Sequence, residues 1–412
     1  MKIAFFLNRF PMLSQTFVLN QITGLIDRGH EVDIYAIRPE NDTKMHADVT
    51  KYNLLNRTHY FRDIPSNKLL RGVTVVSLLI KNYYRKPTSL LKFLRFSRYG
   101  KISVVKILCA IEAFPAKGAY DIVQCHFGPN GILAVILRNI GVIEGKIVTT
   151  FHGYDISSYI KKNGDDVYKN LFGEGDIFLP ISERWKNTLI EMGCDERKIF
   201  VHRMGIDTSK FLCSPRNHKE NGKVRLLTIC RLVEKKGVKY AVRAVAKVLG
   251  RYPNLEYKIA GDGPLKIQLE GLIKELNIQD NVKILGWKNQ EEIVELLKDT
   301  DILIAPSITG TDGEQEGIPV ALMEALAQGL PVLSTQHSGI PELIQDGESG
   351  FLVREGDVDA LAERLEFFLL HPEIWSKMGR AGREHVEKYY NIDTLNDRLA
   401  GLYQELLAGK LS

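Results

Sequence analysis

Short apolar runs alternate with amphipathic segments along almost the whole chain. The apolar runs are bounded by Gly, Pro, Asn or Ser, which is typical of strands buried in a parallel sheet. They lie at residues 2–7, 31–37, 121–125, 146–151, 178–182, 224–229, 255–260, 282–285, 301–307 and 332–334. Helices are expected between them, among others at residues 14–28, 183–191, 316–329, 357–371 and 392–409. This alternation predicts an α/β protein with parallel sheets.

The alternation falls into two series, separated by a segment at residues 204–223 that is rich in Pro, Asn, Lys and Gly. Such a segment is typical of a domain boundary. We therefore expect one domain at 1–204, a linker at 205–223, a second domain at 224–385 and a C-terminal helix within 386–412. At 412 residues the chain is long enough for two hydrophobic cores.

Composition narrows the class of protein. Apolar residues make up 44% and charged residues 25% of the chain, as in ordinary globular proteins. The N-terminus enters a strand without the layout of a signal peptide, and the longest apolar run, residues 73–80, is too short to cross a bilayer. The five cysteines lie far apart with no paired spacing, which suits a reducing compartment. We expect a cytoplasmic protein.

Residues 57–117 are strongly basic and rich in apolar and aromatic side chains. They contain 13 Lys and Arg residues, against only Asp63 and Glu112. A basic amphipathic surface of this kind can bind an anionic membrane. Solvated helices packed by their apolar sides, and RNA binding, are the alternatives. The membrane is favoured and no nucleic-acid partner is expected, because no RNA-binding motif accompanies the charge.

The segment from Glu316 to Gly329 carries the most informative chemistry. Pro319 suits the first turn of a helix, and Gly329 followed by Pro331 suits its end. A helix that begins at the carboxyl end of a parallel strand points free N–H groups into a crevice, which favours a phosphate. Eight helical residues rise about 12 Å, so Glu316 would reach sugar hydroxyls and Glu324 a ribose. A solvated helix with two surface glutamates is the alternative.

Two cations follow the first strand of the second series. Arg231 and Lys236 lie at its carboxyl end, on the same side as the start of the 316–324 helix, and would clamp a diphosphate without a metal. Gly263 lies in a turn suited to close backbone approach, and Trp287 follows the third strand. Basic loops are common, so this signal is weak on its own.

Two histidines, His126 and His152, follow separate strands of the first series. Ligands of open parallel sheets bind outside the carboxyl ends of the strands, so the pair indicates a polar crevice. One histidine alone is as often a structural residue. His152 is the stronger candidate because Gly153 lets the backbone approach a ligand and Asp155 is placed to orient the ring.

The first strand–helix turn has no Gly-x-Gly-x-x-Gly, so a nicotinamide or flavin dinucleotide is not expected. Ser14 and Thr16, at the start of the first helix, suit an N-cap as well as a ligand contact. There is no metal-binding His pair, Asp-x-Asp motif or nucleophile elbow in the sequence. Neither a metal nor a cofactor is expected.

Taken together, these residues resemble the retaining glycosyltransferases of family 4, and within them the subgroup that builds exopolysaccharide or colanic-acid-like repeat units. The resemblance covers nearly the whole chain and is densest from 224 to 353. It rests on the Glu-x7-Glu spacing of Glu316 and Glu324, on Arg231 and Lys236, and on the blocks at 261–264 and 339–342. It implies the GT-B fold, in which two Rossmann-like domains face each other across a cleft and the C-terminal helix crosses back to the N-terminal domain.

The resemblance also implies the roles of the two domains and of the candidate residues. The N-terminal domain would bind the acceptor and the C-terminal domain the nucleotide sugar. The expected catalytic residues are His152, Glu316, Arg231 and Lys236. Donor binding is expected at Arg231, Lys236, Gly317, Ile318, Pro319, Val320, Glu324, Gly263 and Trp287, and acceptor-side contacts at Ser14, Thr16, His126 and Asp155.

The implied reaction is transfer of a hexose, galactose by analogy with the subgroup, with retention at the anomeric carbon. The donor would be a nucleotide diphosphate sugar, UDP-linked, and the acceptor a polyprenyl-diphosphate-linked glycan at the inner face of the plasma membrane. A GT-B sugar-nucleotide epimerase, a dinucleotide oxidoreductase and a non-catalytic nucleotide-sugar-binding partner of a synthesis complex are the alternatives. The missing glycine motif disfavours the oxidoreductase.

Overall fold

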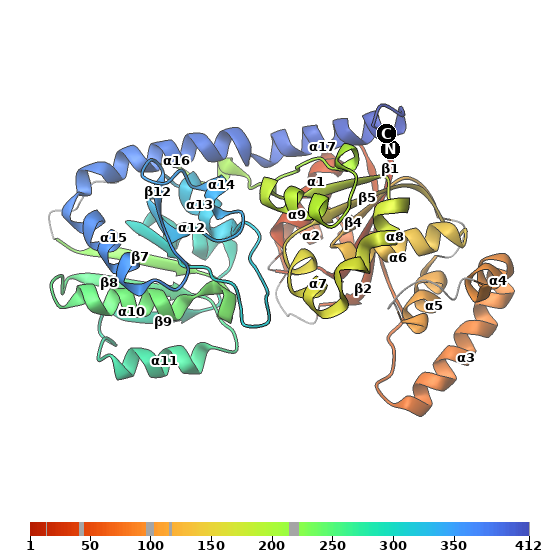
Figure 1. The fold of residues 1–412 in the computed structure, drawn as a ribbon, viewed down its shortest axis with the longest axis horizontal. Helices are drawn as coiled ribbons and strands as arrows, with labels where there is room; N and C mark the ends of the chain where they lie inside the picture. The colour runs from red at the N-terminus through yellow and green to blue at the C-terminus, as the bar shows by residue number, and fades with distance from the viewer. Residues whose placement is uncertain (14, 41–44, 96–102, 115–117, 214–221, 412) are drawn as a thin grey trace. The chain divides into compact units, whose positions relative to one another are not determined.

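The computed structural model describes residues 1–13, 15–40, 45–95, 103–114, 118–213 and 222–411. The chain divides into two compact units. The N-terminal unit comprises Met1–Ile181, Trp185–His202 and Asn396–Ser412, and the C-terminal unit comprises Ser182–Arg184 and Arg203–Leu395. Each unit holds one parallel sheet (Figure 1).

The N-terminal sheet has six strands in the order β3-β2-β1-β4-β5-β6, all parallel. The strands are β1 (Lys2–Phe10), β2 (Glu31–Pro39), β3 (Thr58–Tyr60), β4 (Gly118–His126), β5 (Ile143–Phe151) and β6 (Ile177–Pro180). The helices are α1 (Thr16–Asp27), α2 (Ala47–Lys51), α3 (Lys68–Arg85), α4 (Pro87–Arg95), α5 (Val104–Ala113), α6 (Gly128–Asn139), α7 (Ser158–Asn163), α8 (Lys169–Glu174) and α9 (Glu183–Glu191).

The C-terminal sheet has the order β12-β11-β10-β7-β8-β9, again all parallel. Its strands are β7 (Val224–Ile229), β8 (Leu255–Ala260), β9 (Val282–Gly286), β10 (Ile302–Ala305), β11 (Val332–Thr335) and β12 (Gly350–Val353). The helices are α10 (Val238–Leu249), α11 (Lys266–Glu275), α12 (Gln290–Lys298), α13 (Val320–Ala327), α14 (Ile340–Leu343), α15 (Val358–Leu370), α16 (Trp375–Tyr389) and α17 (Ile392–Leu407).

Both sheets follow the Rossmann strand order, in which the direction of winding reverses once. The reversal lies between β1 and β4 in the first sheet and between β7 and β10 in the second. Loops leaving adjacent strands at such a point part to opposite faces of the sheet and leave a crevice at the strand ends, where ligands bind. Ligand contacts are therefore expected in the loops after β1, β4, β7 and β10.

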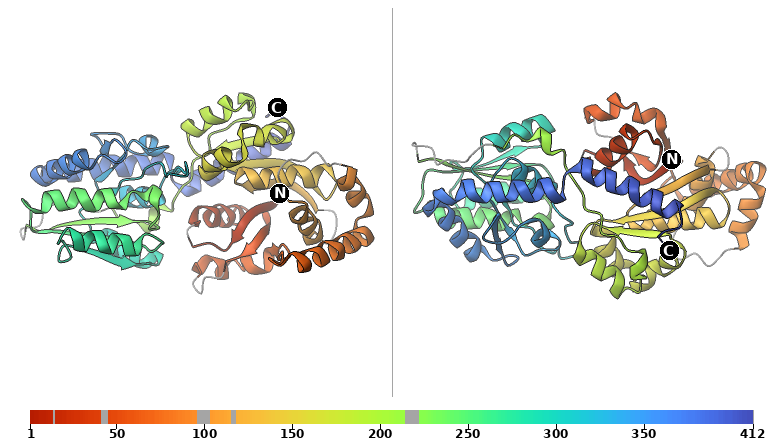
Figure 2. Two further views of the ribbon diagram at one scale, coloured as in Figure 1. Left: turned by 60° about the horizontal axis from the view of Figure 1, so that its bottom comes forward. Right: turned by 90° about the horizontal axis from the view of Figure 1, so that it is seen from above.

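The strands are apolar because helices cover both faces of each sheet (Figure 2). In β1, the side chains of Ile3, Ala4 and Phe5 are completely buried. The last part of α17 belongs to the N-terminal unit, and its Leu399 and Tyr403 lie in the core of that unit. The Tyr403 hydroxyl donates a hydrogen bond to Gln124 Oε1 at 2.7 Å. This contact ties the C-terminal helix to β4.

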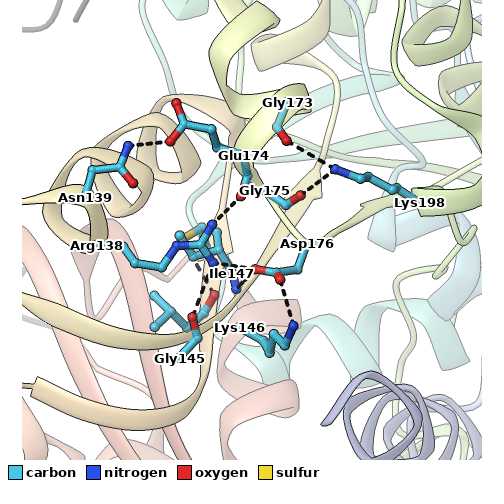
Figure 3. A network of polar contacts seen from close by, with 12 residues as sticks. Arg138, Asn139, Gly145, Lys146, Ile147, Gly173, Glu174, Gly175, Asp176 and Lys198 are labelled. Carbon is cyan, nitrogen blue, oxygen red and sulfur yellow. Dashed lines mark hydrogen bonds and ion pairs between the residues drawn. The ribbon is translucent and has the colours of Figure 1, made fainter. Parts of the chain in front are cut away.

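A polar network fastens the amino ends of β5 and β6 (Figure 3). The Asp176 carboxylate accepts a hydrogen bond from the Ile147 N–H at 2.8 Å and pairs with Arg138 of α6 and with Lys146. Lys198 donates to the carbonyl of Gly175, just after α8, at 3.1 Å. A cation there satisfies carbonyls that the helix leaves unpaired. The network lies at the opposite end of the sheet from His152 and is structural.

Candidate functional site

The crevice of the C-terminal unit is built from three neighbouring segments. Arg231 and a 3-10 turn, η6 (Glu234–Lys236), follow β7, and a loop at residues 306–319 follows β10. We call residues 306–319 the Glu316 loop. It leads into α13, so residues far apart in sequence meet where the winding of the sheet reverses.

The structure corrects the predicted start of the helix. α13 begins at Val320, and Pro319 is its N-cap with an extended backbone, ψ 123°. The residue before a proline is disfavoured in helical conformation, so the helix cannot extend back through Ile318. Glu316 therefore lies on the loop, and the helical rise expected between Glu316 and Glu324 does not apply. Pro319 also has no N–H, so the first N–H groups of the helix are those of Val320 and Ala321.

Lys236 and Glu316 form a largely buried ion pair. The Lys236 ammonium lies 2.6 Å from Glu316 Oε2, and the two side chains are only 17% and 14% exposed. Burial alone would raise the pKa of Glu316, but the ammonium groups of Lys236 and Lys235 outweigh it and lower this pKa to about 2. Lys236, predicted as an open phosphate ligand, thus already has an anionic partner. Arg231 is exposed, and no ion pair to it is found among the described residues.

The pKa of Glu324 is shifted in the opposite direction to that of Glu316. It is buried within α13, and burial raises its pKa to about 7. Gln290, the first residue of α12, donates a hydrogen bond from Nε2 to Glu324 Oε1 at 2.8 Å. The sequence did not indicate Gln290, because 34 residues separate it from Glu324. Its position at a helix start after a predicted strand was the only signal.

The glycines after β8 approach the protein's own backbone closely. Gly261 and Gly263 have φ values of 154° and 156°. A Cβ at Gly261 would lie 1.8 Å from the Cys230 carbonyl oxygen, and one at Gly263 would lie 2.6 Å from that of Leu232. These glycines thus hold the loop that carries Arg231. Trp287, directly after β9, is 38% exposed.

In the N-terminal unit, His126 and His152 lie side by side. His126 Nδ1 is 2.9 Å from His152 Nε2, and His126 Nε2 is 2.9 Å from Gln21 Oε1. Burial lowers the pKa of His126 to about 3 and, with His126 beside it, lowers the pKa of His152 well below its ordinary value. Both rings are therefore neutral. His126 is fully buried and contacts His152, so it would influence a ligand through the His152 ring.

Asp155 does not orient the His152 ring, contrary to the prediction. Its carboxylate accepts backbone N–H groups instead, from His152 and Gly153 at 3.0 Å each and from Gly128 at 2.9 Å. Three N–H donors converging on a buried carboxylate satisfy it without the ring. Asp155 fixes the backbone after β5 and the start of α6, whereas the His152 ring contacts His126, which is held in turn by Gln21.

The start of α1 is described only in part. Thr16 is the first helical residue, and the N-cap position is taken by Gln15, which makes no side-chain cap. Ser14 lies outside the described residues. Within the described part of the chain, no group of three or more His, Cys, Asp or Glu side chains is arranged to hold a metal ion. The predicted ligand roles of all these residues stay predictions.

Comparisons with known proteins identify the family. The model of the family "Glycosyltransferase Family 4" matches residues 14–210, and that of "Glycosyl transferases group 1" matches residues 213–385. The colanic acid biosynthesis glycosyltransferase WcaL of Escherichia coli K12 is 42% identical over 412 residues, which cover 98% of this chain and all of WcaL. The chain belongs to the family 4 glycosyltransferases. The predicted enzyme class is confirmed.

Two further similarities bear on this glycosyltransferase. The amylovoran biosynthesis glycosyltransferase AmsK of Erwinia amylovora is 44% identical over 412 residues, covering 98% of this chain and all of AmsK. Among solved structures, HepE of Anabaena in complex with UDP superimposes with a TM-score of 0.71 at 17% identity, over 98% of this chain and all of HepE. With two six-stranded parallel sheets in Rossmann order, this likeness confirms the predicted GT-B fold.

Proposed function

We propose that the enzyme transfers a hexose from a nucleotide diphosphate sugar to a lipid-linked oligosaccharide during exopolysaccharide synthesis. The printed names of WcaL and AmsK, which place those relatives in colanic acid and amylovoran biosynthesis, support the pathway. Binding of UDP by HepE supports a UDP-linked donor. Galactose is our first choice of sugar. The C-terminal unit would bind the donor and the N-terminal unit the acceptor.

The observation that carries the proposal is the placement of two glutamates at the β7/β10 crevice, with Glu316 paired to Lys236 and Glu324 buried on α13. Glu316 stays ionised because Lys236 is 2.6 Å away, so it can accept hydrogen bonds from sugar hydroxyls. Glu324, on the helix behind it, would accept the ribose hydroxyls. Arg231, Lys236 and the first N–H groups of α13 would meet the diphosphate between them.

In the reaction, the bond between the anomeric carbon and the diphosphate oxygen breaks, and a bond to the acceptor oxygen forms on the same face. The acceptor's hydroxyl proton passes to the departing phosphate oxygen. The charge growing on that phosphate is the largest electrostatic demand, and preorganised cations stabilise it. Lys236 would turn from Glu316 to the phosphate as the donor binds. His152 would contact the transferred sugar.

A donor screen tests the chemistry. Purified enzyme is incubated with UDP-galactose, UDP-glucose or GDP-mannose, with and without a polyprenyl-diphosphate glycan, and products are analysed by mass spectrometry. We expect an acceptor mass increase of one hexose with a single donor. Conversion of the donor to its epimer without acceptor would support the epimerase instead, and binding without turnover would support a non-catalytic partner.

Calorimetry tests the orientation of the donor. Glu324→Ala should weaken UDP binding by about 10- to 100-fold, the effect of losing hydrogen bonds to a charged group. Glu316→Ala should leave UDP binding within about twofold but reduce use of the whole donor. Glu314→Ala, on the same loop and paired with Lys235 at 2.7 Å, is the matched control. The reverse pattern would mean that the donor lies the other way round.

We further propose that the enzyme binds the anionic inner face of the plasma membrane through α3. The side chains at 69, 73, 76 and 80 recur at helical spacing and are exposed, with Leu69 at 81%. The opposite face packs inward at 74, 78 and 82, toward α5. Lys68 borders the apolar stripe, whereas Arg71 and Arg85 are exposed near the two ends of the helix on the side of 74, 78 and 82, and α3 contains no acidic residue. Such a helix suits a membrane interface.

The structure narrows which cations of 57–117 face outward. Lys86 lies 5.7 Å from the centre of the Phe114 ring, and burial lowers its pKa to about 8. Lys81 pairs with Glu112, and Lys106 is largely buried with a pKa lowered to about 8. Arg98, Lys101 and Lys117 lie outside the described residues. No helix of the described residues is long and apolar enough to cross a bilayer.

Vesicle flotation tests this surface. Each juxtamembrane cation contributes about 1 kcal/mol, so the triple variant Lys68→Ser/Arg71→Ser/Arg85→Ser should bind anionic vesicles roughly 100-fold more weakly. Neither the wild type nor the triple variant should float with neutral vesicles. The matched control replaces three exposed cations of the C-terminal unit, at positions 243, 274 and 388, by serine. Equal recovery of the triple variant and the control would mean that these charges are only a solvated face.

A further inference from the structure

The Glu316 loop is fastened on one side by the η6 turn. Lys235 pairs with Glu314 at 2.7 Å, in addition to the pair between Lys236 and Glu316. Glu234 accepts hydrogen bonds from the N–H and hydroxyl of Thr311 at 3.0 and 2.8 Å. All of these contacts except the Thr311 N–H are made by loop side chains.

On the other side, the loop is fastened by its backbone. The Glu316 N–H donates a hydrogen bond to His337 Nε2 at 3.0 Å. His337 Nδ1 lies 2.6 Å from Glu355 Oε1, and the second oxygen of the same carboxylate accepts the Thr309 N–H at 2.7 Å. Glu355 thus holds the loop near its start directly and at Glu316 through His337. His337 follows β11 and Glu355 follows β12, so the two anchors come from neighbouring strands.

These contacts fix the state of the imidazole. A backbone N–H can only donate, so His337 Nε2 must be the unprotonated nitrogen. Nδ1 therefore carries the hydrogen and donates it to the Glu355 carboxylate. The His337 side chain is 1% exposed, so water cannot replace either partner. In this state the ring binds the peptide N–H of Glu316 and leaves its carboxylate to Lys236.

The turn that carries His337 is itself held against the loop. Ser338 has a left-handed backbone with φ 50°, which costs a non-glycine residue free energy and persists only where the surroundings enforce it. A Cβ on Gly339 would lie 2.8 Å from the Ile318 side chain. The 337–339 turn therefore contacts the Glu316 loop at Glu316 and at Ile318.

We propose that His337 and Glu355 are positioning residues for Glu316 in the transfer reaction. The inference rests on the proposed function, in which Glu316 binds the transferred sugar. When the donor diphosphate draws Lys236 away, the side-chain anchor of Glu316 is lost. The hydrogen bond from its peptide to His337 then holds the carboxylate at the sugar. A defect in this anchor should lower kcat with the sugar donor and leave the binding of UDP unchanged.

Three variants test the proposal. His337→Phe keeps a ring of similar size but removes both polar contacts, and we expect kcat to fall at least tenfold with the UDP dissociation constant within twofold of wild type. His337→Gln places an amide oxygen near the position of Nε2 and should recover part of kcat. The matched control is His371→Phe, which breaks an exposed contact of the same kind, His371 Nδ1 to Glu373 Oε1 at 3.0 Å, and should change nothing.

Nitrogen-15 NMR of the wild-type enzyme, labelled at histidine, tests the geometry directly, and a variant is needed only to assign the resonances. We expect one resonance pair, assigned by its loss in His337→Gln, with Nδ1 protonated and Nε2 bare at neutral pH. The opposite tautomer or an imidazolium would overturn the proposal, as would an unchanged kcat in His337→Phe or a parallel loss of UDP binding. Glu316→Ala separates the two hypotheses. If Glu316→Ala leaves kcat intact, the role of Glu316 in the proposed function fails. If Glu316→Ala lowers kcat but His337→Phe does not, only the positioning role of His337 is refuted.

Discussion

Replacing Lys236 by Met should destabilise the C-terminal unit through Glu316. Methionine preserves most of the aliphatic length of lysine and removes the charge. The Glu316 carboxylate, 14% exposed, would then lie in the protein without the ammonium that is now 2.6 Å away. Breaking a buried ion pair by removing one partner is costly because the other charge stays buried.

The pKa of Glu316 gives the magnitude. It is lowered from an ordinary value of 4.5 to about 2. A lowering of this size corresponds to about 3 kcal/mol of stability, which is present above pH 4.5 and is lost as the pH falls from 4.5 to 2. Lys236→Met should thus lose at least about 3 kcal/mol at pH 8, because the burial of Glu316 is then no longer offset by the Lys236 ammonium. In the variant, buried Glu316 has a raised pKa, as Glu324 has, so protonation should relieve part of the loss near pH 5.

The double variant Lys236→Met/Glu316→Gln should recover most of the loss, since it leaves no buried charge. For a unit of this size, about 3 kcal/mol shifts the melting temperature by roughly 6–12 °C. The chain has three tryptophans, and Trp287 and Trp375 lie in the C-terminal unit. Fluorescence melting in a Trp185→Phe background therefore follows that unit alone.

Arg231→Met is the control, because Arg231 is exposed on the neighbouring loop, and its melting temperature should stay within about 2 °C of the parent. Two results would refute the reasoning. One is a Lys236→Met protein as stable as its parent at pH 8. The other is a double variant no more stable than the single one, which would mean that the methionine, not the unpaired carboxylate, causes the loss.

Two further predictions follow from the donor site. Arg231→Ala should lose about 2–4 kcal/mol of transition-state stabilisation, measured as a fall in kcat/KM, with little change in the free energy of unfolding. A near-normal kcat/KM in steady-state kinetics would exclude Arg231 from the diphosphate clamp. Because the pKa of Glu324 is raised to about 7, a ribose bound by its carboxylate should bind more tightly as the pH rises from 6 to 8, with proton release. Calorimetry with a UDP-sugar, whose phosphates do not titrate in this range, should show this effect, and Glu324→Gln should abolish it.

Much of the fold could be predicted from the sequence. The bounds of β7 and β8 agree with the apolar runs at 224–229 and 255–260, because a strand covered on both faces must be apolar throughout. The start of α13 was wrong, since the restraint that Pro319 places on the residue before it outweighed the preference of proline for a first turn. The end of the helix was predicted correctly, with Gly329 at φ 78° following it.

The candidate site was less predictable, because its contacts depend on strand order. Lys236 and Glu316 are 80 positions apart and meet only because β7 and β10 are neighbours at the reversal of winding. His337 reaches Glu316 in the same way, from β11 beside β10. Asp155 was misassigned for a local reason. An acid three residues after a histidine can bind either its ring or its backbone N–H, and the sequence cannot distinguish the two.

The two glutamates of the Glu-x7-Glu pattern show why one residue type can serve two tasks. Glu324 is buried and Glu316 largely so, yet the pKa of Glu316 is about 2 and that of Glu324 about 7. The difference is the neighbour, an ammonium beside Glu316 and a neutral amide from Gln290 beside Glu324. Surroundings that give two carboxyl groups different pKa values allow the two groups to take different roles. Glu316 remains an anion at every physiological pH and can balance Lys236 until a phosphate replaces it. Glu324 exchanges its proton near neutrality, so burial costs it little when the site is empty, and in the proposed function the ribose hydroxyls would favour its ionised form.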